Sequence, residues 1–184
     1  MPKQLPTLKC KMKLLRPADA PRGSSWAFVV LPKAVSSKLP RRGRVVVNVN
    51  INGQTFRATL EPDGQKSHWL KISKRLRESA GVAVGDSIAL ELTALDKEPE
   101  PDVPADFRKA LKAAPDAYVV WTDITPLARQ DWVHWVTSAK RDETRRHRID
   151  SACDMLASGK RRACCFDRSG VYSKGFAAPK AAED

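Results

Sequence analysis

The sequence GRVVVNVNINGQTFRATL, residues 43–60, predicts a β-hairpin. In its first arm the side chains at every second position are apolar: Val45, Val47, Val49 and Ile51. Asn52 and Gly53 follow, and both tolerate the positive φ angles of a type I′ turn. Phe56, Ala58 and Leu60 repeat the period of two on the returning arm. Because the side chains of a strand alternate between its two faces, we expect the four residues of the first arm to point inward.

An edge strand is expected upstream of this hairpin, over residues 8–14. Its apolar side chains alternate with Lys9, Lys11 and Lys13. Charge along a strand discourages further pairing, so three lysines at alternate positions favour the edge of a sheet. The same lysines could instead form a basic stripe for phosphate groups, and that alternative stays open.

The remaining elements of the first half are short. Further strands are expected at residues 25–32, 67–72 and 88–92, and short helices at 33–39 and 74–80. Ser73 is a suitable N-cap for the second helix and Gly81 a suitable residue after its end. Six short strands without a βαβ rhythm predict a small, closed or nearly closed, antiparallel-rich split β-barrel over residues 8–96.

The second half of the chain has helical composition. Residues 97–103 are acidic and rich in proline, so we expect a linker there. Helices are expected at residues 107–114, 126–141 and 144–158, while residues 117–122 form either a packed loop or another helix. The predicted class is therefore α+β: a flexible N-terminus at 1–7, the barrel, the linker, a helical segment at 104–160 and a disordered basic tail at 161–184.

The positive charge of the chain is concentrated at its two ends. The formal net charge is +12. Residues 1–44 hold eleven Lys and Arg against one acidic residue, residues 45–139 hold eleven against thirteen, and residues 140–184 hold eleven against seven. An excess of this kind favours anionic partners such as nucleic acid, anionic lipid or an acidic protein.

Residues 139–149, AKRDETRRHRI, bring charge into an apolar helical pattern. If one helix continues from Trp132, then Glu143 and Arg146 extend its apolar face. On that basis we expect both side chains to be at least partly buried, with Arg146 facing the barrel. A polar site, a salt bridge to another element, or a break between two shorter helices would each explain the pattern.

A candidate anion-binding set follows from this stretch. It consists of Lys140, Glu143, Arg145, Arg146 and Arg148, with Trp69 and Trp121 as aromatic side chains able to line a groove. Arginine suits phosphate and carboxylate groups because its guanidinium donates two parallel hydrogen bonds. The competing interpretation is that Glu143 and Arg146 form a structural ion pair.

Several classes of function lack their signature in this sequence. There is no Gly-x-Ser-x-Gly elbow and no phosphate-binding Gly-x-x-x-x-Gly-Lys loop. The four cysteines, Cys10, Cys153, Cys164 and Cys165, form no Cys-x-x-Cys pair and no zinc-binding spacing. There is also no secretory leader pattern and no apolar run of about 18 residues. We therefore expect a cytoplasmic, monomeric protein with reduced thiols, without catalytic residues, metal or cofactor.

Short motifs give the chain a family resemblance. In the first half they are WAFVVLP at 26–32, GRV at 43–45 leading to NG at 52–53, and GVAVGDSI at 81–88. In the second half they are DWVHWV at 131–136, AK at 139–140, ETR at 143–145 and RI at 148–149. The first set resembles the domain-of-unknown-function 1905 family. The second resembles the helical segment named for YdeI and OmpD-associated proteins, which is linked in name to bacteriocin protection.

The resemblance covers roughly residues 8–160 and implies a bacterial protein with a split β-barrel, distantly like the barrels of AbrB-type transcription factors. It implies no established reaction. Two functions are compatible with it. One is a non-enzymatic cytosolic protein that binds an anionic ligand or partner between barrel and helices, in stress or antimicrobial-peptide tolerance. The other is a nucleic-acid-binding barrel.

Overall fold

The chain folds into two compact units in the computed structural model, which describes residues 5–20, 25–163 and 177–183. Residues 1–97 and 175–184 make up the first, the barrel unit, and residues 98–174 the second, the helical unit. The predicted flexible N-terminus and basic tail lie partly outside the described residues, as do Cys164 and Cys165.

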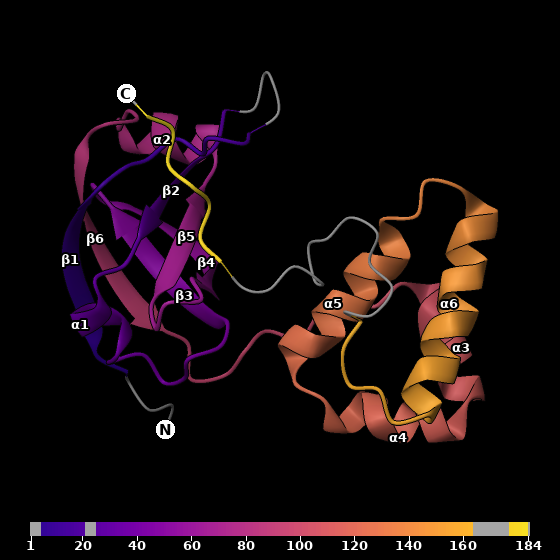
Figure 1. Ribbon diagram of the computed structural model, residues 1–184. Coiled ribbons are helices and arrows are strands. Elements are labelled where there is room, and N and C mark those ends of the chain that lie inside the picture. Colours follow the sequence, from indigo (N-terminus) through magenta and orange to yellow (C-terminus); the bar gives the residue numbers. More distant parts are fainter. Residues whose placement is uncertain (1–4, 21–24, 164–176, 184) are drawn as a thin grey trace. The chain divides into compact units, whose positions relative to one another are not determined.

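The barrel unit is built on a six-stranded sheet with the order β1-β6-β3-β4-β5-β2 (Figure 1). Its strands are β1 (Thr7–Lys13), β2 (Ala27–Val30), β3 (Val45–Ile51), β4 (Gln54–Pro62), β5 (His68–Ile72) and β6 (Ser87–Ala94). All strand pairs are antiparallel, and the sheet curls into a half-barrel. Leu15 and Phe28 exchange two backbone hydrogen bonds of 2.8 and 2.9 Å, which connect the β1 end of the sheet to β2. The predicted α+β class with an antiparallel barrel is confirmed.

The β3–β4 hairpin has the predicted turn. Asn52 and Gly53 take φ angles of +50° and +83°, the region that a type I′ turn requires. The four apolar residues of β3 that were expected to point inward are buried in the barrel core: Val45, Val47, Val49 and Ile51. Asn52 also donates a 2.9 Å hydrogen bond from Nδ2 to the carbonyl of Ala80, so the turn is tied to the end of the helix α2 (Lys74–Ala80).

The lysine-bearing strand β1 lies at one end of the sheet, as its pattern predicts. Lys9, Lys11 and Lys13 are exposed, while the residues between them contact the core. Lys9 forms an ion pair of 2.7 Å with Glu91 on the neighbouring strand β6. Its ammonium group is therefore already paired within the sheet.

Two short helices complete the barrel unit, α1 (Lys33–Ser36) and α2. The hydroxyl of Ser73 accepts a 3.3 Å hydrogen bond from the backbone N–H of Leu76, which is the expected N-cap of α2. Gly81 ends this helix with a left-handed φ of +66°. Local sequence signals therefore set both ends of α2.

In its described residues the helical unit contains α3 (Ala105–Ala113), α4 (Pro115–Asp123), α5 (Pro126–Thr137) and α6 (Asp142–Ala157). Its core is a separate cluster of buried side chains that includes Phe107, Leu111, Trp132, Val136 and Leu156. Residues 117–122, left open between a loop and a helix, belong to α4. No helix among the described residues has both the length and the apolar character needed to cross a membrane.

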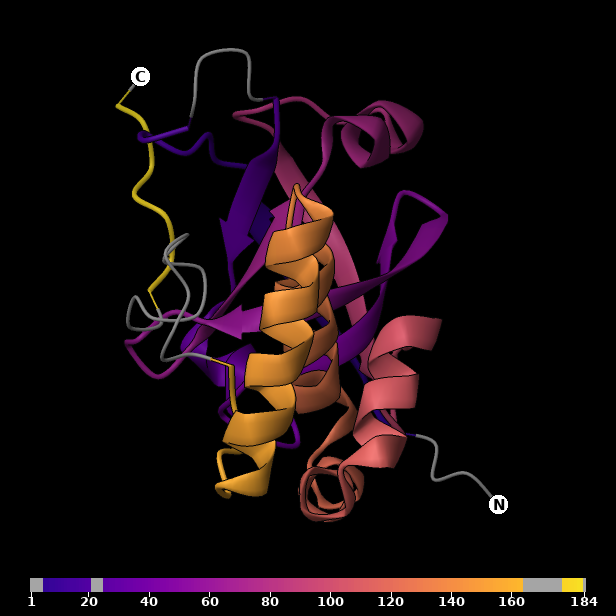
Figure 2. The ribbon, with the colours of Figure 1, turned by 90° about the vertical axis from the view of Figure 1, so that its right-hand side faces the viewer.

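The charged stretch 139–149 contains the break between two helices. α5 ends at Thr137, and α6 begins at Asp142 after a short connection. α6 folds back along α5, as Figures 1 and 2 show. Of the three explanations that the sequence leaves open for Glu143 and Arg146, the structure contains the break between two helices.

The C-terminal segment pairs with the barrel unit, which the sequence did not reveal. The backbone N–H of Ala18 donates to the carbonyl of Lys180, and the N–H of Ala182 donates to the carbonyl of Arg16, each at 2.8 Å. Pro17 and Ala181 form the antiparallel bridge between these bonds (Figure 1, yellow segment). Two backbone hydrogen bonds are a small contact, but they assign this segment to the barrel unit.

Candidate functional site

Arg145, one of the predicted anion-binding residues, is engaged in an ion pair within the helical unit. Its Nε and Nη2 atoms lie 2.7 and 2.9 Å from the two carboxylate oxygens of Asp106 on α3. The hydrogen bond from Arg145 lowers the pKa of Asp106, and the bond to Asp106 raises the pKa of Arg145. This two-pronged contact links α6 to α3 and uses Nε–H and one N–H of Nη2.

The expectation that Glu143 and Arg146 are partly buried is wrong, since both side chains are exposed. The reason is the helix break, because the apolar face of α5 does not continue in phase through residues 138–141. The buried face of α6 consists of Ile149, Ala152, Cys153 and Leu156. At 100° per residue, Arg146 lies roughly 70° from the centre of that face.

The competing interpretation, a structural ion pair between Glu143 and Arg146, is not formed within the described part of the chain. Lys140 is exposed as well, in the connection between the two helices. A role of these three side chains in anion binding therefore stays a prediction.

Arg148 has the most informative position of the predicted residues. Its Nη1 donates to the backbone carbonyl of Trp135 at 2.6 Å and to the hydroxyl of Ser138 at 3.0 Å. Its guanidinium carbon lies 5.5 Å from the centre of the Trp135 ring, within range of a cation–π interaction. A guanidinium has five N–H groups, and these two bonds use only those on Nη1. Within the described residues, the donors on Nε and Nη2 have no protein acceptor.

A pocket of about 510 Å³ lies beside Arg148, and we call it the α6 pocket. It is lined by Thr144, His147, Arg148, Ser151, Asp154 and Met155 of α6, together with Trp135 of α5. The α6 residues recur at intervals of three and four, which places them along one flank of the helix. The Trp135 ring and the Met155 side chain give the pocket apolar surface, and the other side chains give it hydrogen-bonding groups.

The charges of the α6 pocket have different signs at its two ends. Arg148 and His147 lie in the first half of α6, and Asp154 lies about two turns further along the helix. Within the described part of the chain, neither His147 nor Asp154 has a side-chain hydrogen bond or an ion pair. The sequence analysis selected neither His147 nor Asp154. The spacing of three and four residues from Thr144 onward could have indicated that these side chains share one flank of a helix.

The two candidate tryptophans lie in different units. Trp121 is buried in the core of the helical unit, where its ring meets that of Phe107 edge-on at 5.4 Å. Trp69 is half-buried on the outer face of β5 in the barrel unit. It covers Phe28 with an edge-on contact of 6.3 Å and lies 6.5 Å from the Trp26 ring. The ammonium group of Lys71 sits 4.7 Å from the Trp26 ring.

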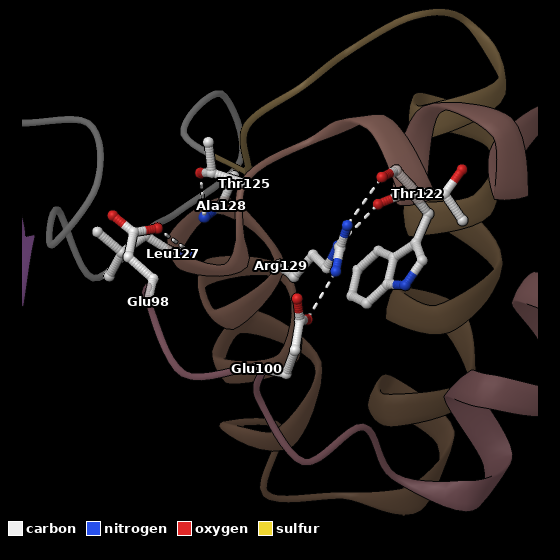
Figure 3. A network of polar contacts seen from close by, with 8 residues as sticks. Glu98, Glu100, Thr122, Thr125, Leu127, Ala128 and Arg129 are labelled. Atoms are coloured by element: carbon white, nitrogen blue, oxygen red, sulfur yellow. Dashed lines mark hydrogen bonds and ion pairs between the residues drawn. The ribbon is translucent and has the colours of Figure 1, made fainter. Parts of the chain in front are cut away.

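Arg129 is a well-anchored cation that the sequence analysis did not select. Its Nε donates to the carbonyl of Trp121 at 2.9 Å, and its Nη2 donates to the carbonyl of Thr122 at 2.8 Å (Figure 3). Its Nη1 donates to the Glu100 carboxylate at 2.6 Å. Because the two carbonyls belong to the last turn of α4, Arg129 closes the C-terminus of that helix. Its role is structural.

The barrel unit contains a buried serine–histidine pair, which also has a structural explanation. His68 Nδ1 lies 2.6 Å from the hydroxyl of Ser36, and Nε2 lies 2.8 Å from the carbonyl of Gly43. A carbonyl only accepts, so Nε2 carries a proton and donates to Gly43. The two residues are 1% and 5% exposed, which leaves no room for a substrate.

Metal binding has no support in the described residues, where no group of three or more His, Cys, Asp or Glu side chains is arranged to hold an ion. The free thiols of Cys10 and Cys153 lie in different units. Burial raises the pKa of both thiols, and for Cys153 the neighbouring carboxylates of Asp150 and Asp154 add to this effect. A raised pKa disfavours the thiolate, the form that binds metals and attacks substrates.

Comparisons with known families support the two-part organisation. Residues 13–92 match the family described as Domain of unknown function (DUF1905). Residues 100–159 match the family described as Bacteriocin-protection, YdeI or OmpD-Associated. No curated protein matches the chain. The two matches follow one another in the order that the motifs indicate, which confirms the resemblance read from the sequence.

Proposed function

We propose that this is a non-enzymatic protein that binds an anionic ligand or partner in the α6 pocket. The observation that carries this proposal is that the guanidinium of Arg148 is held in place but keeps donors without an acceptor. Its position is fixed by Trp135 and Ser138, yet its Nε and Nη2 donors have no acceptor within the described residues. From the sequence alone we expected the ligand between barrel and helices; the pocket that supports the proposal lies within the helical unit.

The chemistry of the pocket favours a particular kind of anion. A guanidinium with two adjacent donors binds a carboxylate or phosphate oxygen pair side-on. Thr144 and Ser151 add hydroxyl groups on the same flank. The ring of Trp135 and the thioether of Met155 favour a ligand that also has an apolar part, because burying that part releases water from both surfaces.

A role in bacteriocin or antimicrobial-peptide tolerance is the biological context that we propose, and the printed family description supports it. The formal charge of the whole chain is +12, so a cationic peptide would be repelled. Protection through an anionic intermediary is therefore favoured over direct capture of a cationic peptide. We further propose that the protein works in the cytoplasm, because Cys10 and Cys153 are free thiols.

Two experiments test this proposal. The first measures binding of octanoate, an apolar carboxylate, to the full chain by following the indole N–H signal of Trp135 in NMR spectra. Arg148→Gln should weaken binding about tenfold, while Arg146→Gln, which removes the same charge outside the pocket, should not. Equal binding to both variants would overturn the pocket assignment. The second compares bacterial survival under peptide challenge with wild-type and Arg148→Gln protein; equal survival would remove the tolerance role.

A second candidate function, nucleic-acid binding by the barrel unit, is favoured by one specific observation. Trp26, Trp69 and Lys71 form an aromatic and cationic surface on the outer face of β2 and β5. Single-stranded nucleic acids stack their bases on such side chains. Binding of a labelled single strand should fall steeply with salt and weaken with Trp69→Ala. Binding that depends on salt but not on Trp69 would indicate only general polyanion attraction.

A further inference from the structure

We infer that the α6 pocket takes a dipolar ligand, and specifically a short apolar peptide with a free carboxylate at one end and a free ammonium group at the other. This inference rests on the proposed function and extends it. A purely anionic ligand would contact the cationic end of the pocket favourably, but it would make no favourable contact with the carboxylate of Asp154. That carboxylate would repel a ligand that carried only negative charge.

The two charged ends of the pocket, which we call its poles, are formed by different side chains, and each has hydrogen-bonding groups without a protein partner among the described residues. Arg148 forms the cationic end, with the His147 ring beside it, and Asp154 forms the acidic end. Asp154 has no hydrogen bond or ion pair with its side chain among the described residues, so no neighbouring cation compensates its charge there. A cationic group of the ligand would supply this compensation. The pocket therefore selects for a separation of charge as well as for its sign.

The distance between the poles sets the length of the ligand. Residues 148 and 154 are six apart, which is about 9 Å along the axis of an α-helix. An extended peptide spans at most about 3.3–3.6 Å per residue, so three residues bridge roughly 10 Å. A single amino acid, whose charged groups are separated by one carbon, is too short to reach both ends.

The wall between the poles suits a peptide. The Trp135 ring and Met155 offer apolar contact to its side chains, and Met155 adapts readily to different shapes. Ser151 lies between the poles along the flank, and its hydroxyl can both donate to a peptide carbonyl and accept from a peptide N–H. The pocket thus offers contacts to each part of a tripeptide: both termini, the backbone and the side chains.

The test uses three forms of one peptide: trileucine with free termini, its N-acetylated form and its C-terminal amide. Each is titrated into the full chain while the NMR signals of the Trp135 indole and the His147 ring are followed. Free trileucine should bind most tightly. The acetylated form and the amide should each bind about tenfold more weakly, since each loses one charge-assisted contact.

Two pairs of variants assign the termini to the poles. Asp154→Asn should bind free and acetylated trileucine alike, because it no longer distinguishes a charged N-terminus. Asp150→Asn, which removes a carboxylate from an exposed position of α6 outside the pocket, should keep the wild-type preference. Arg148→Gln should lose the preference for free trileucine over its amide, and Arg146→Gln should keep it. If Arg148→Gln does not fold, the comparison of free trileucine with its amide on the wild-type chain tests the contact with the carboxylate.

The outcomes separate this inference from the proposed function. If acetylated and free trileucine bind equally, and both depend on Arg148, the dipolar ligand is overturned and anion binding stands. If free trileucine binds without any effect of Asp154→Asn, the assignment of its ammonium group to Asp154 is overturned. If no carboxylate-bearing form binds in a manner that depends on Arg148, the proposed function fails and this inference fails with it.

Discussion

The barrel unit and the helical unit differ in what their arginine and lysine side chains do. In the barrel unit, strand pairing determines the shape, and the cations of β1 lie on its exposed face. In the helical unit, arginines join or close the helices through Arg129, Arg145, Arg148 and Arg161. The lysines of β1 therefore lie on the surface of the sheet, whereas the arginines of the helical unit hold its helices together.

This difference determines how charge substitutions must be interpreted. In the helical unit, loss of binding after an arginine is replaced can result from a disturbed helix. Arg148 illustrates the problem, because the same guanidinium binds the carbonyl of Trp135 and borders the pocket. Arg146, at an exposed position of the same helix, provides a control that excludes a general effect of charge. The free energy of unfolding of the Arg148 variant then shows whether the helix itself is disturbed.

The largest effect is expected in the polar interior of the barrel unit. His68→Ala removes the partner of the Ser36 hydroxyl and of the Gly43 carbonyl and leaves a cavity. The buried Ser36 hydroxyl without its partner, together with the lost contact to Gly43 and that cavity, should lower the free energy of unfolding by about 2–4 kcal/mol. Denaturant unfolding followed by hydrogen exchange of the β5 amides measures this loss.

The matched control for His68 lies in the other unit. His147→Ala makes the same chemical change at an exposed position of α6, so its effect on unfolding should stay within about 0.5 kcal/mol. Equal losses in the two variants would contradict the structural role of the buried histidine.

A smaller effect is expected from Arg129→Ala in the helical unit. The substitution removes the donors for the Trp121 and Thr122 carbonyls and leaves the Glu100 carboxylate without its partner (Figure 3). The Arg129 side chain is only 17% exposed, although the side chain of its partner Glu100 is 63% exposed. We expect a loss of about 2 kcal/mol, measured by denaturant unfolding. Arg146→Ala is the control; if it cost as much, a general effect of charge would explain the loss.

Much of the barrel unit was predictable because its signals are local. The period of two, the Asn52-Gly53 turn and the Ser73 cap each involve residues close together in sequence, and each fixes a definite backbone conformation. Such signals agree with the global fold, so they could be used without knowing any distant contact.

The candidate site was less predictable because its geometry depends on a break in the chain and on distant partners. The angular argument assumed one helix, and because the chain breaks after Thr137 it placed Glu143 and Arg146 on the wrong face. Asp142 and Glu143 are the acidic residues of a helical first turn, so a signal for a new start was present in the sequence. In contrast, nothing local shows that Arg145 meets Asp106, 39 residues earlier.

The smallest effect concerns the ion pair between Arg145 and Asp106, and it should depend on pH. Arg145 lowers the pKa of Asp106 in the folded state. A carboxyl group with a lowered pKa stabilises the fold above its unfolded pKa of about 3.9, and this stabilisation is lost as the pH falls through the folded value. Because Asp106 is 47% exposed and screened by solvent, Asp106→Asn should cost at most about 1 kcal/mol at neutral pH.

The pH dependence of this variant separates the ion pair from the general preference of helices for acidic residues in their first turn. Asp116 occupies the first turn of α4 and is exposed, and no arginine among the described residues pairs with it. Asp116→Asn therefore reports that preference alone. The difference between wild type and Asp106→Asn should shrink as the pH is lowered from 7 toward 3, and 1 M salt at pH 7 should shrink it as well. Asp116→Asn should show a smaller difference at pH 7. If the two variants behaved alike at every pH and salt concentration, the contact between α3 and α6 would contribute nothing beyond a favourable helix start. The helical unit would then depend on one arginine fewer than its geometry indicates.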